Sequence, residues 1–275
     1  MFHKYAFLST VAVLSLLTSC ANIDIQAERV PVNIDFIYKI MTNFIPQKCV
    51  YSYIGKTAFI SEKNTNNIHI FKDGKQINTI GGLGFSATNF TKLTDIALSP
   101  DGNLLALDSF QKKIKKFDTR GKFITEFDLK GFIEPILFAV AIDETFYIYD
   151  NAAKEIVITR TFEDSDKYTF GKFQLRSPQK IKLGKKQITI YDKFSDSTIL
   201  FGILGQFQTE EPGNIQWDKQ NQYILKDYFI YHPRTNSKFA INQYKWKDMT
   251  IDDFVILISD QETWIGKIGY SNVTE

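Results

Sequence analysis

A unit of about forty residues recurs along this chain, and the recurrence limits the possible folds more than any other feature of the sequence. In each copy an apolar segment runs into a polar loop: LALDSFQKKIKKFD from residue 105, YIYDNAAKEIVITR from 147, TIYDKFSDSTILFG from 189 and FIYHPRTNSKFAIN from 229. The residues at that junction, Asp108, Asp150, Asp192 and His232, are separated by 42, 42 and 40 positions. Repeats of about 40 to 50 residues are typical of β-propeller blades.

The clearest unit, residues 93–129, predicts four short strands. Their ranges are 95–98, 104–107, 114–117 and 123–127, and the turns between them contain Asp101-Gly102 and Gly121. An Asp-Gly pair supplies the positive φ that tight hairpin turns need. Four antiparallel strands joined by tight turns make one propeller blade.

Two degenerate copies, which start at Ala58 and Val255, bring the predicted number of blades to six. Aromatic and β-branched residues occur in short runs, and no long stretch has the apolar period of 3.6 residues that indicates a helix. Because the last copy arrives early, we expect residues 32–53 to complete it and to close the ring, which removes open sheet edges. The predicted fold class is therefore all-β, a propeller of six four-stranded antiparallel blades.

The N-terminal residues 1–19 have the layout of a signal peptide, with Lys4 before an apolar stretch at 6–17. That stretch is too short for a transmembrane helix, which needs about 20 apolar residues. The sequence Leu17-Thr18-Ser19-Cys20 resembles a bacterial lipobox, which implies that Cys20 is lipidated and becomes the mature N-terminus. Residues 20–31 are then a lipidated tether, and residues 32–275 form the propeller domain. The alternative is an ordinary signal peptide that is cut elsewhere, with Cys20 as a plain thiol.

Charge and cysteine content narrow the choice of partners and of stabilising bonds. The chain carries 33 basic and 31 acidic residues, so nothing suggests a polyanionic partner. If Cys20 is lipidated, Cys49 has no cysteine partner, and we expect it to be a buried apolar residue. A Cys20–Cys49 disulfide remains possible only without lipidation.

Residues 78–127 resemble the NHL repeat and bacterial six-bladed propeller lipoproteins. The similarity rests on Gly81-Gly82, the Asp101-Gly102 turn, Asp108, and Phe117-Asp118 followed by Gly121. The resemblance implies a binding platform or, less often, a lyase or hydrolase whose metal and catalytic residues line the central channel. This chain has few histidines for such a centre, because His69 and His232 alone follow the signal segment.

The junction residues Asp108, Asp150, Asp192 and His232 are the candidate metal ligands, since symmetry could place their side chains in a ring around the channel. The structural alternative is that each aspartate accepts hydrogen bonds from the backbone N–H groups of its own loop. No catalytic residue and no resident cofactor is predicted from a motif. We also expect most of the basic run 112–116 to be a solvated strand edge or face.

These patterns predict a non-enzymatic binding or scaffolding module of the cell envelope. It would be lipid-anchored, at the outer membrane and facing the periplasm or the cell surface. Ala21, directly after the lipobox cysteine, favours the outer membrane. The predicted partner is an envelope protein or a saccharide, bound by a loop-rich face to which aromatic residues such as Phe110 could contribute. Export excludes nucleic acid. The alternative function is a metal-dependent hydrolase or lyase that uses the channel.

Overall fold

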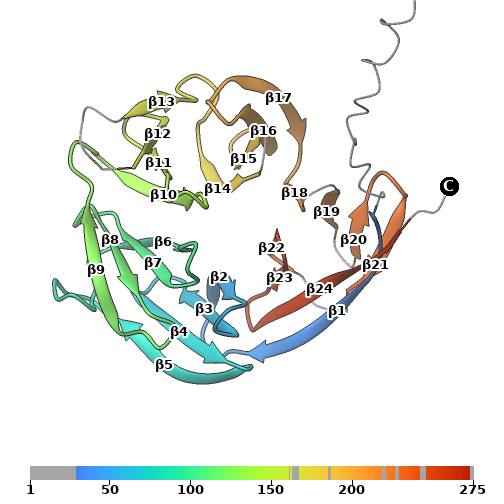
Figure 1. Cartoon of the computed structure of the whole chain (residues 1–275), viewed down its shortest axis with the longest axis horizontal. Helices are drawn as coiled ribbons and strands as arrows, with labels where there is room; N and C mark the ends of the chain where they lie inside the picture. Colours follow the sequence, from blue (N-terminus) through green and yellow to red (C-terminus); the bar gives the residue numbers. More distant parts are fainter. Residues whose placement is uncertain are drawn as a thin grey trace, which may run out of the picture.

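The computed structural model describes residues 29–160, 162, 167–184, 187–218, 221–226, 229–241 and 246–272. Within these ranges six four-stranded antiparallel sheets form a ring, and none of the described residues is helical. The predicted all-β, six-bladed propeller is therefore confirmed (Figure 1). No helix in the described part of the chain is long and apolar enough to cross a membrane. The signal segment and Cys20 lie outside the described residues.

Each blade runs from an inner strand beside the central opening to an outer strand at the rim (Figure 1). The first blade contains β2 (Pro46–Ser52), β3 (Thr57–Glu62), β4 (Asn67–Lys72) and β5 (Lys75–Gly81), and the second contains β6 (Leu93–Leu98), β7 (Leu104–Asp108), β8 (Lys113–Phe117) and β9 (Phe123–Asp128). The third contains β10 (Pro135–Val140), β11 (Phe146–Asp150), β12 (Glu155–Thr159) and β13 (Tyr168–Phe170), and the fourth β14 (Pro178–Leu183), β15 (Gln187–Asp192), β16 (Ser197–Gly202) and β17 (Phe207–Pro212). The fifth contains β18 (Ile215–Trp217), β19 (Gln222–Lys226), β20 (Phe229–His232) and β21 (Ser237–Ala240), and the sixth β22 (Asp248–Ile251), β23 (Val255–Ile258), β24 (Glu262–Asn272) and β1 (Arg29–Met41).

The second blade follows its sequence prediction, with strands that extend one or two residues further than expected. Gly102 and Gly121 have φ values of 78° and 88°, as the two predicted turns require. A side chain at Gly121 would also collide with the first blade, because its Cβ would lie 2.6 Å from Ile70 Cδ1. This turn therefore needs glycine both for its backbone conformation and for close packing between blades.

The ring is closed by pairing the two ends of the chain. β1 pairs with β24 along its length, from Arg29↔Asn272 to Met41↔Glu262. The prediction that residues 32–53 complete the last blade is confirmed only in part: β1 joins that blade, whereas β2 starts the first blade. The strand also begins at Arg29 instead of Val32, so residues 29–31 belong to β1 and not to the tether.

The fifth blade corrects the repeat alignment. Asp108, Asp150 and Asp192 each end the second strand of their blade, whereas His232 ends β20, the third strand of its blade. The repeat alignment therefore matched the segment from residue 229 with the second strands of the other blades, although it forms a third strand. Because neighbouring antiparallel strands run in opposite directions, His232 lies at the opposite edge of the ring from the three aspartates.

Two faces of the propeller follow from this strand alternation. We call the edge that carries Asp108, Asp150 and Asp192 the aspartate face, and the other edge the opposite face. The loops between second and third strands, and those between blades, are on the aspartate face. The remaining turns within the blades, together with Arg29 and Asn272, are on the opposite face.

Five clusters of buried apolar side chains pack between the blades. Cys49 lies in the cluster that joins the first and last blades, where it is 2% exposed, so the expected buried apolar role is confirmed. Many aromatic side chains of the strands are likewise buried, Tyr149 and Trp264 among them. Phe110, in contrast, has an exposed side chain on the aspartate face.

Candidate functional site

Asp108 is completely buried and holds two loops of the aspartate face together. Its Oδ2 accepts the backbone N–H of Thr91 at 2.6 Å, and its Oδ1 accepts that of Lys92 at 3.2 Å, just before β6 begins. The same Oδ1 accepts the N–H groups of Phe110 and Gln111 in the loop that follows β7. The carboxylate therefore supplies the hydrogen-bond acceptor for four backbone N–H groups in these part-buried loops.

Asp150 and Asp192 repeat this arrangement in the next two blades. Asp150 accepts the N–H groups of Ile133, Glu134, Ala152 and Ala153, and Asp192 accepts those of Arg176, Ser177, Phe194 and Ser195. The structural alternative for these aspartates is thus confirmed. We call Asp108, Asp150 and Asp192 the loop caps.

The four candidate metal ligands are not brought together. His232 also makes its side-chain hydrogen bonds within its own blade. Its Nδ1 lies 2.6 Å from Thr235 Oγ1, and its Nε2 lies 3.2 Å from Asn221 Oδ1. Burial lowers its pKa, which favours the neutral imidazole. Among the described residues there is no group of three or more His, Cys, Asp or Glu side chains that could hold a metal ion.

The loop caps display exposed aromatic rings. Phe110 and Phe194 each lie two positions after a cap, and each donates its backbone N–H to that cap. Their side chains are 65% and 66% exposed, although the backbone that carries them is pinned. Other large apolar residues exposed in the loops of the aspartate face are Met41, Ile45, Leu83, Phe85, Ile133 and Phe173. These exposed residues make the aspartate face the candidate interaction surface.

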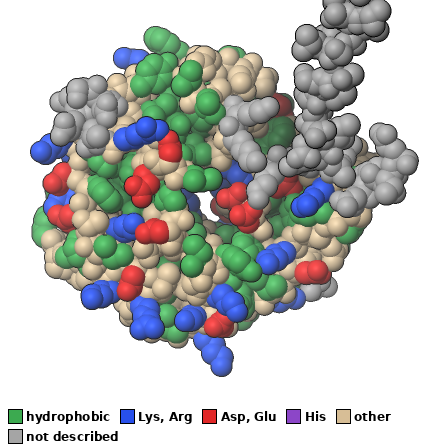
Figure 2. Space-filling view, viewed as in Figure 1, with side chains coloured by type: hydrophobic (Ala, Val, Ile, Leu, Met, Phe, Trp, Pro, Cys, Tyr) green, Lys and Arg blue, Asp and Glu red, His purple; other side chains and the backbone are tan. Residues whose placement is uncertain are grey.

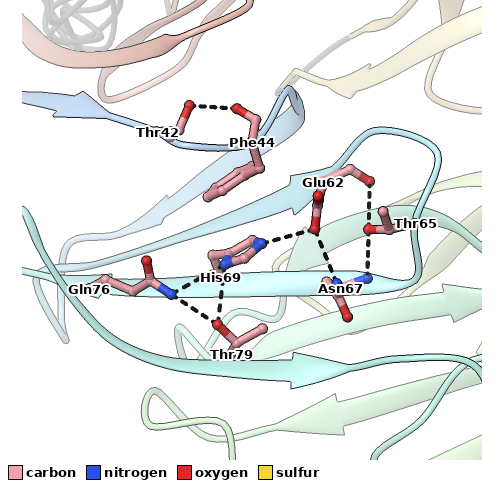
Figure 3. Close-up of polar contacts among 8 residues, drawn as sticks. All are labelled: Thr42, Phe44, Glu62, Thr65, Asn67, His69, Gln76 and Thr79. Atoms are coloured by element: carbon pink, nitrogen blue, oxygen red, sulfur yellow. Dashed lines mark hydrogen bonds and ion pairs between the residues drawn. The ribbon is translucent and has the colours of Figure 1, made fainter.

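The first blade has Glu62 where the second, third and fourth blades have a loop cap, and Glu62 forms a different network (Figure 3). Glu62 accepts from Asn67 Nδ2 at 3.1 Å and lies 3.2 Å from His69 Nε2. Burial alone would raise the pKa of Glu62, but the hydrogen bonds from Asn67 and His69 outweigh it and lower the pKa. The His69 ring stacks on Phe44 with centroids 3.7 Å apart, and Gln76 and Thr79 contact its Nδ1. These contacts use both ring nitrogens of His69.

The middle of the ring contains paired charges that the sequence analysis missed. Figure 2 shows an opening there, with charged side chains at its edge. Lys48 on β2 pairs with Asp95 on β6 at 2.5 Å, and Asp95 also accepts the backbone N–H of Phe138 on β10. On the other side, Lys180 on β14 pairs with Asp248 on β22. The first set of contacts thus links β2, β6 and β10, and the second links β14 and β22, so inner strands of five blades take part.

Burial controls the charges of this channel network. It raises the pKa of Asp95, against the opposing effect of Lys48, and it lowers the pKa of Lys180, against that of Asp248. Burial also lowers the pKa of Lys182, whose ammonium donates to the carbonyl groups of Trp217 and Ile251. Each of these charged groups has a protein partner on another blade. The network therefore joins the inner strands of the blades.

A sequence signal for this network did exist. Pro-Gln-Lys occurs at 46–48 and again at 178–180, which is 132 positions, or about three blade periods, further on. In both strands the register shifts between the proline and the lysine, and the same shift occurs between Leu93 and Asp95. A β-bulge re-aims the side chain that follows it, so the third residue of an inner strand was a candidate channel residue.

The basic run at 112–116 also differs from its prediction. Lys115 is fully buried, and its ammonium donates to the carbonyl groups of Ser86 and Asn89 in the preceding loop. Lys113 and Lys116 are partly exposed and form ion pairs with Glu126 and Asp101. The expected solvated face was therefore wrong for Lys115, because the loop before β6 covers that side of β8.

Comparisons with known proteins agree with this architecture. A family model described as "6-bladed beta-propeller" matches residues 50–190. Similar solved structures include virginiamycin B lyase from Staphylococcus aureus, with 14% sequence identity, a TM-score of 0.53 and coverage of 80% of each chain. A streptogramin B lyase has 11% identity and a TM-score of 0.56, with 88% of this chain and 97% of that chain covered. Raptor from Chaetomium thermophilum has 7% identity and a TM-score of 0.56, with 90% and 29% covered.

These likenesses to solved structures establish the fold alone, because all three identities are low. No curated protein matches this chain.

Replacing Asp108 with alanine should lower the free energy of unfolding by about 3 kcal/mol or more, because four backbone donors lose a buried acceptor. Urea unfolding followed by circular dichroism measures this loss. The control is Asp118→Ala, which removes the acceptor of an exposed turn and should cost about 1 kcal/mol. If Asp108 instead held a structural metal ion, a chelator would destabilise the unmutated protein as much as Asp108→Ala does.

Removing Asp248 should destabilise the protein by about 3 kcal/mol at pH 7, since the largely buried Lys180 ammonium loses its carboxylate and keeps the carbonyl of Met249 as a partner. The double variant Lys180→Met/Asp248→Leu should recover most of that loss. The deficit of Asp248→Ala should also shrink as pH rises towards 10. Burial lowers the folded pKa of Lys180 below its unfolded value, so the unfolded chain binds more protons in that window and stability rises with pH. Urea unfolding at several pH values tests this; a deficit that grows with pH contradicts it.

Proposed function

The chain belongs to the DUF5128 family of 6-bladed β-propellers, and we propose that it is a lipoprotein acting as a non-enzymatic binding module of the cell envelope. The repeat at residues 78–127 supports grouping it with NHL-repeat-like bacterial lipoproteins. The observation that carries the binding role is the display of Phe110 and Phe194 on loops fixed by buried aspartates.

The capped loops suit binding for a thermodynamic reason. A flexible loop loses conformational entropy when a partner orders it, and this loss reduces affinity. Here Asp108 and Asp192 already hold the loop backbone, so contact with the exposed rings requires little further ordering. Exposed aromatic side chains are also the residue type that most often dominates binding energy at protein interfaces.

The partner that this surface fits best is an envelope protein with an apolar patch. The loops of the aspartate face present mainly Phe, Leu, Ile and Met side chains, which gain free energy when they are removed from water. Saccharide capture is the other outcome that a partner search can return. Nucleic acid is not a partner in this proposal, since the protein acts outside the cytoplasm.

Lipidation of Cys20 supplies the anchor in this proposal, and the sequence Leu17-Thr18-Ser19-Cys20 supports it. Ala21 after the cysteine favours the outer membrane, with the propeller facing the periplasm or the cell surface.

The enzymatic alternative has less support from the contacts of its candidate residues. Its candidate ligands Asp108, Asp150, Asp192 and His232 bind groups of their own blades. The lyases among the similar structures share the fold at 11–14% identity and therefore lend no catalytic residue.

Mass spectrometry of the mature protein, expressed with its own N-terminus in a bacterial host, should find a diacylglycerol-modified Cys20 as the first residue. The variant Cys20→Ser should be recovered without lipid and should leave the membrane fraction. An unmodified Cys20, or cleavage at another position, contradicts the proposed anchor.

The double variant Phe110→Ser/Phe194→Ser should bind an envelope partner at least tenfold more weakly than the unmutated protein. Both rings are exposed, so their removal should leave the thermal unfolding temperature nearly unchanged. Affinity capture from solubilised envelope, followed by titration of the captured partner, measures the change. The matched control is Ile124→Ser on the outer strand β9, which should bind normally. Equal loss in the control contradicts a role for the aspartate face.

A further inference from the structure

The described chain begins at the outer rim of the opposite face. Arg29 pairs with Asn272 at the end of β24, and its carbonyl accepts from Asn221 Nδ2 in the fifth blade. Asn221 lies in the turn between β18 and β19, which belongs to the same face. The position from which the preceding segment leaves the propeller is therefore fixed.

The segment that would link an anchor at Cys20 to the propeller is short. Arg29 follows Cys20 by nine positions, and a fully extended chain of this length reaches about 30 Å. It joins the propeller at Arg29 on the opposite face, whereas the other end of β1, Met41, lies at the aspartate face. An anchor at Cys20 is therefore tethered closest to the opposite face.

The opposite face presents apolar residues at the tips of its turns. Ile142 is 93% exposed between β10 and β11, Ile54 is 75% exposed between β2 and β3, and Leu204 is 64% exposed between β16 and β17. Their neighbours Glu144, Lys56 and Gly205 have positive φ values, so these are tight turns with little freedom to fold the side chains inward. Three separate blades therefore carry an exposed aliphatic tip on one face.

An amphipathic group accompanies one of these tips. Tyr53, next to Ile54, is 61% exposed, and Lys267 Nζ lies 4.8 Å from the centroid of its ring. Tyrosine and lysine side chains place an apolar body in the acyl region and a polar end among the lipid headgroups. This pair suits the boundary between water and lipid better than it suits free solution.

We propose that the opposite face rests on the lipid bilayer, with the turns of Ile54, Ile142 and Leu204 entering the headgroup region. This inference rests on the proposed function through the lipidated Cys20. It adds the orientation of the module: the membrane side is the face of the aliphatic tips, and the loop caps with their aromatic rings point away from it. The aspartate face exposes more apolar residues, but the chain leaves the propeller from the opposite face, and this exit makes the opposite face the membrane side in this proposal.

Site-specific quenching tests the orientation with the full-length lipidated protein in vesicles of phosphatidylethanolamine and phosphatidylglycerol. One sample carries a fluorophore on Ile142→Cys, and the matched sample carries it on Phe173→Cys, which is as exposed but lies on the aspartate face. Cys49 does not interfere, because it is buried and burial raises its pKa. Lipids with a nitroxide near the headgroup should quench the label at 142 at least threefold more than the label at 173.

A second variant separates contact from mere proximity. Adding Ile54→Asp and Leu204→Asp to the protein labelled at 142 should reduce its quenching by half or more, while circular dichroism stays that of the unmutated fold. Equal quenching at 142 and 173, stronger quenching at 173, or no effect of the aspartates overturns the orientation. Mass spectrometry of the same vesicles distinguishes the two proposals. Lipidated protein with equal quenching contradicts the orientation alone, whereas protein without lipid on Cys20 contradicts the anchor and the orientation together.

Discussion

The pairing of β1 with β24 is the constraint on which the rest of this molecule depends. Without β1, β24 would be an exposed edge strand, open to pairing with other chains. The pairing joins residues more than two hundred positions apart in sequence and turns six sheets into a ring without a free end. It also decides that the described chain starts and ends on the same face, at Arg29 and Asn272, and so gives the two faces different surroundings.

The lysine–aspartate pairs in the middle of the ring also help to hold it closed. The fifth blade has short strands of three to five residues, so it offers little sheet with which to join its neighbours. Lys180 and Lys182 on β14 reach past this blade to β22, where they contact Asp248 and the carbonyl of Ile251. Burying these ammonium groups costs solvation energy, and the cost is met only because each finds an oxygen partner. These charged pairs therefore act as a junction between blades.

Local features were predictable from the sequence, and features that depend on distant contacts were not. The strands and turns of the second blade follow from alternation and from Asp101-Gly102, which act within a few residues. His232 was assigned to the wrong strand because adjacent antiparallel strands of a blade look alike in sequence. Alternation gives the side of β8 on which Lys115 lies, but not that the loop at 86–89 covers it. The Lys180–Asp248 pair is separated by 68 positions and has no local signal except the repeated Pro-Gln-Lys.

The loop caps explain how this propeller keeps aromatic rings exposed on loops whose backbone is fixed. An exposed phenylalanine on a free loop tends to collapse onto the nearest apolar surface, where it is hidden from a partner. Asp108 and Asp192 fix the backbone N–H of the phenylalanine itself, so the loop conformation that presents each ring is held, while the side chain keeps its own torsions. A carboxylate that first resembles a metal ligand thus acts on the loop, and the aromatic residue two positions later is the group exposed on it. For the same reason Asp150, which is followed by Ala152 at that position, holds its loop without displaying a ring.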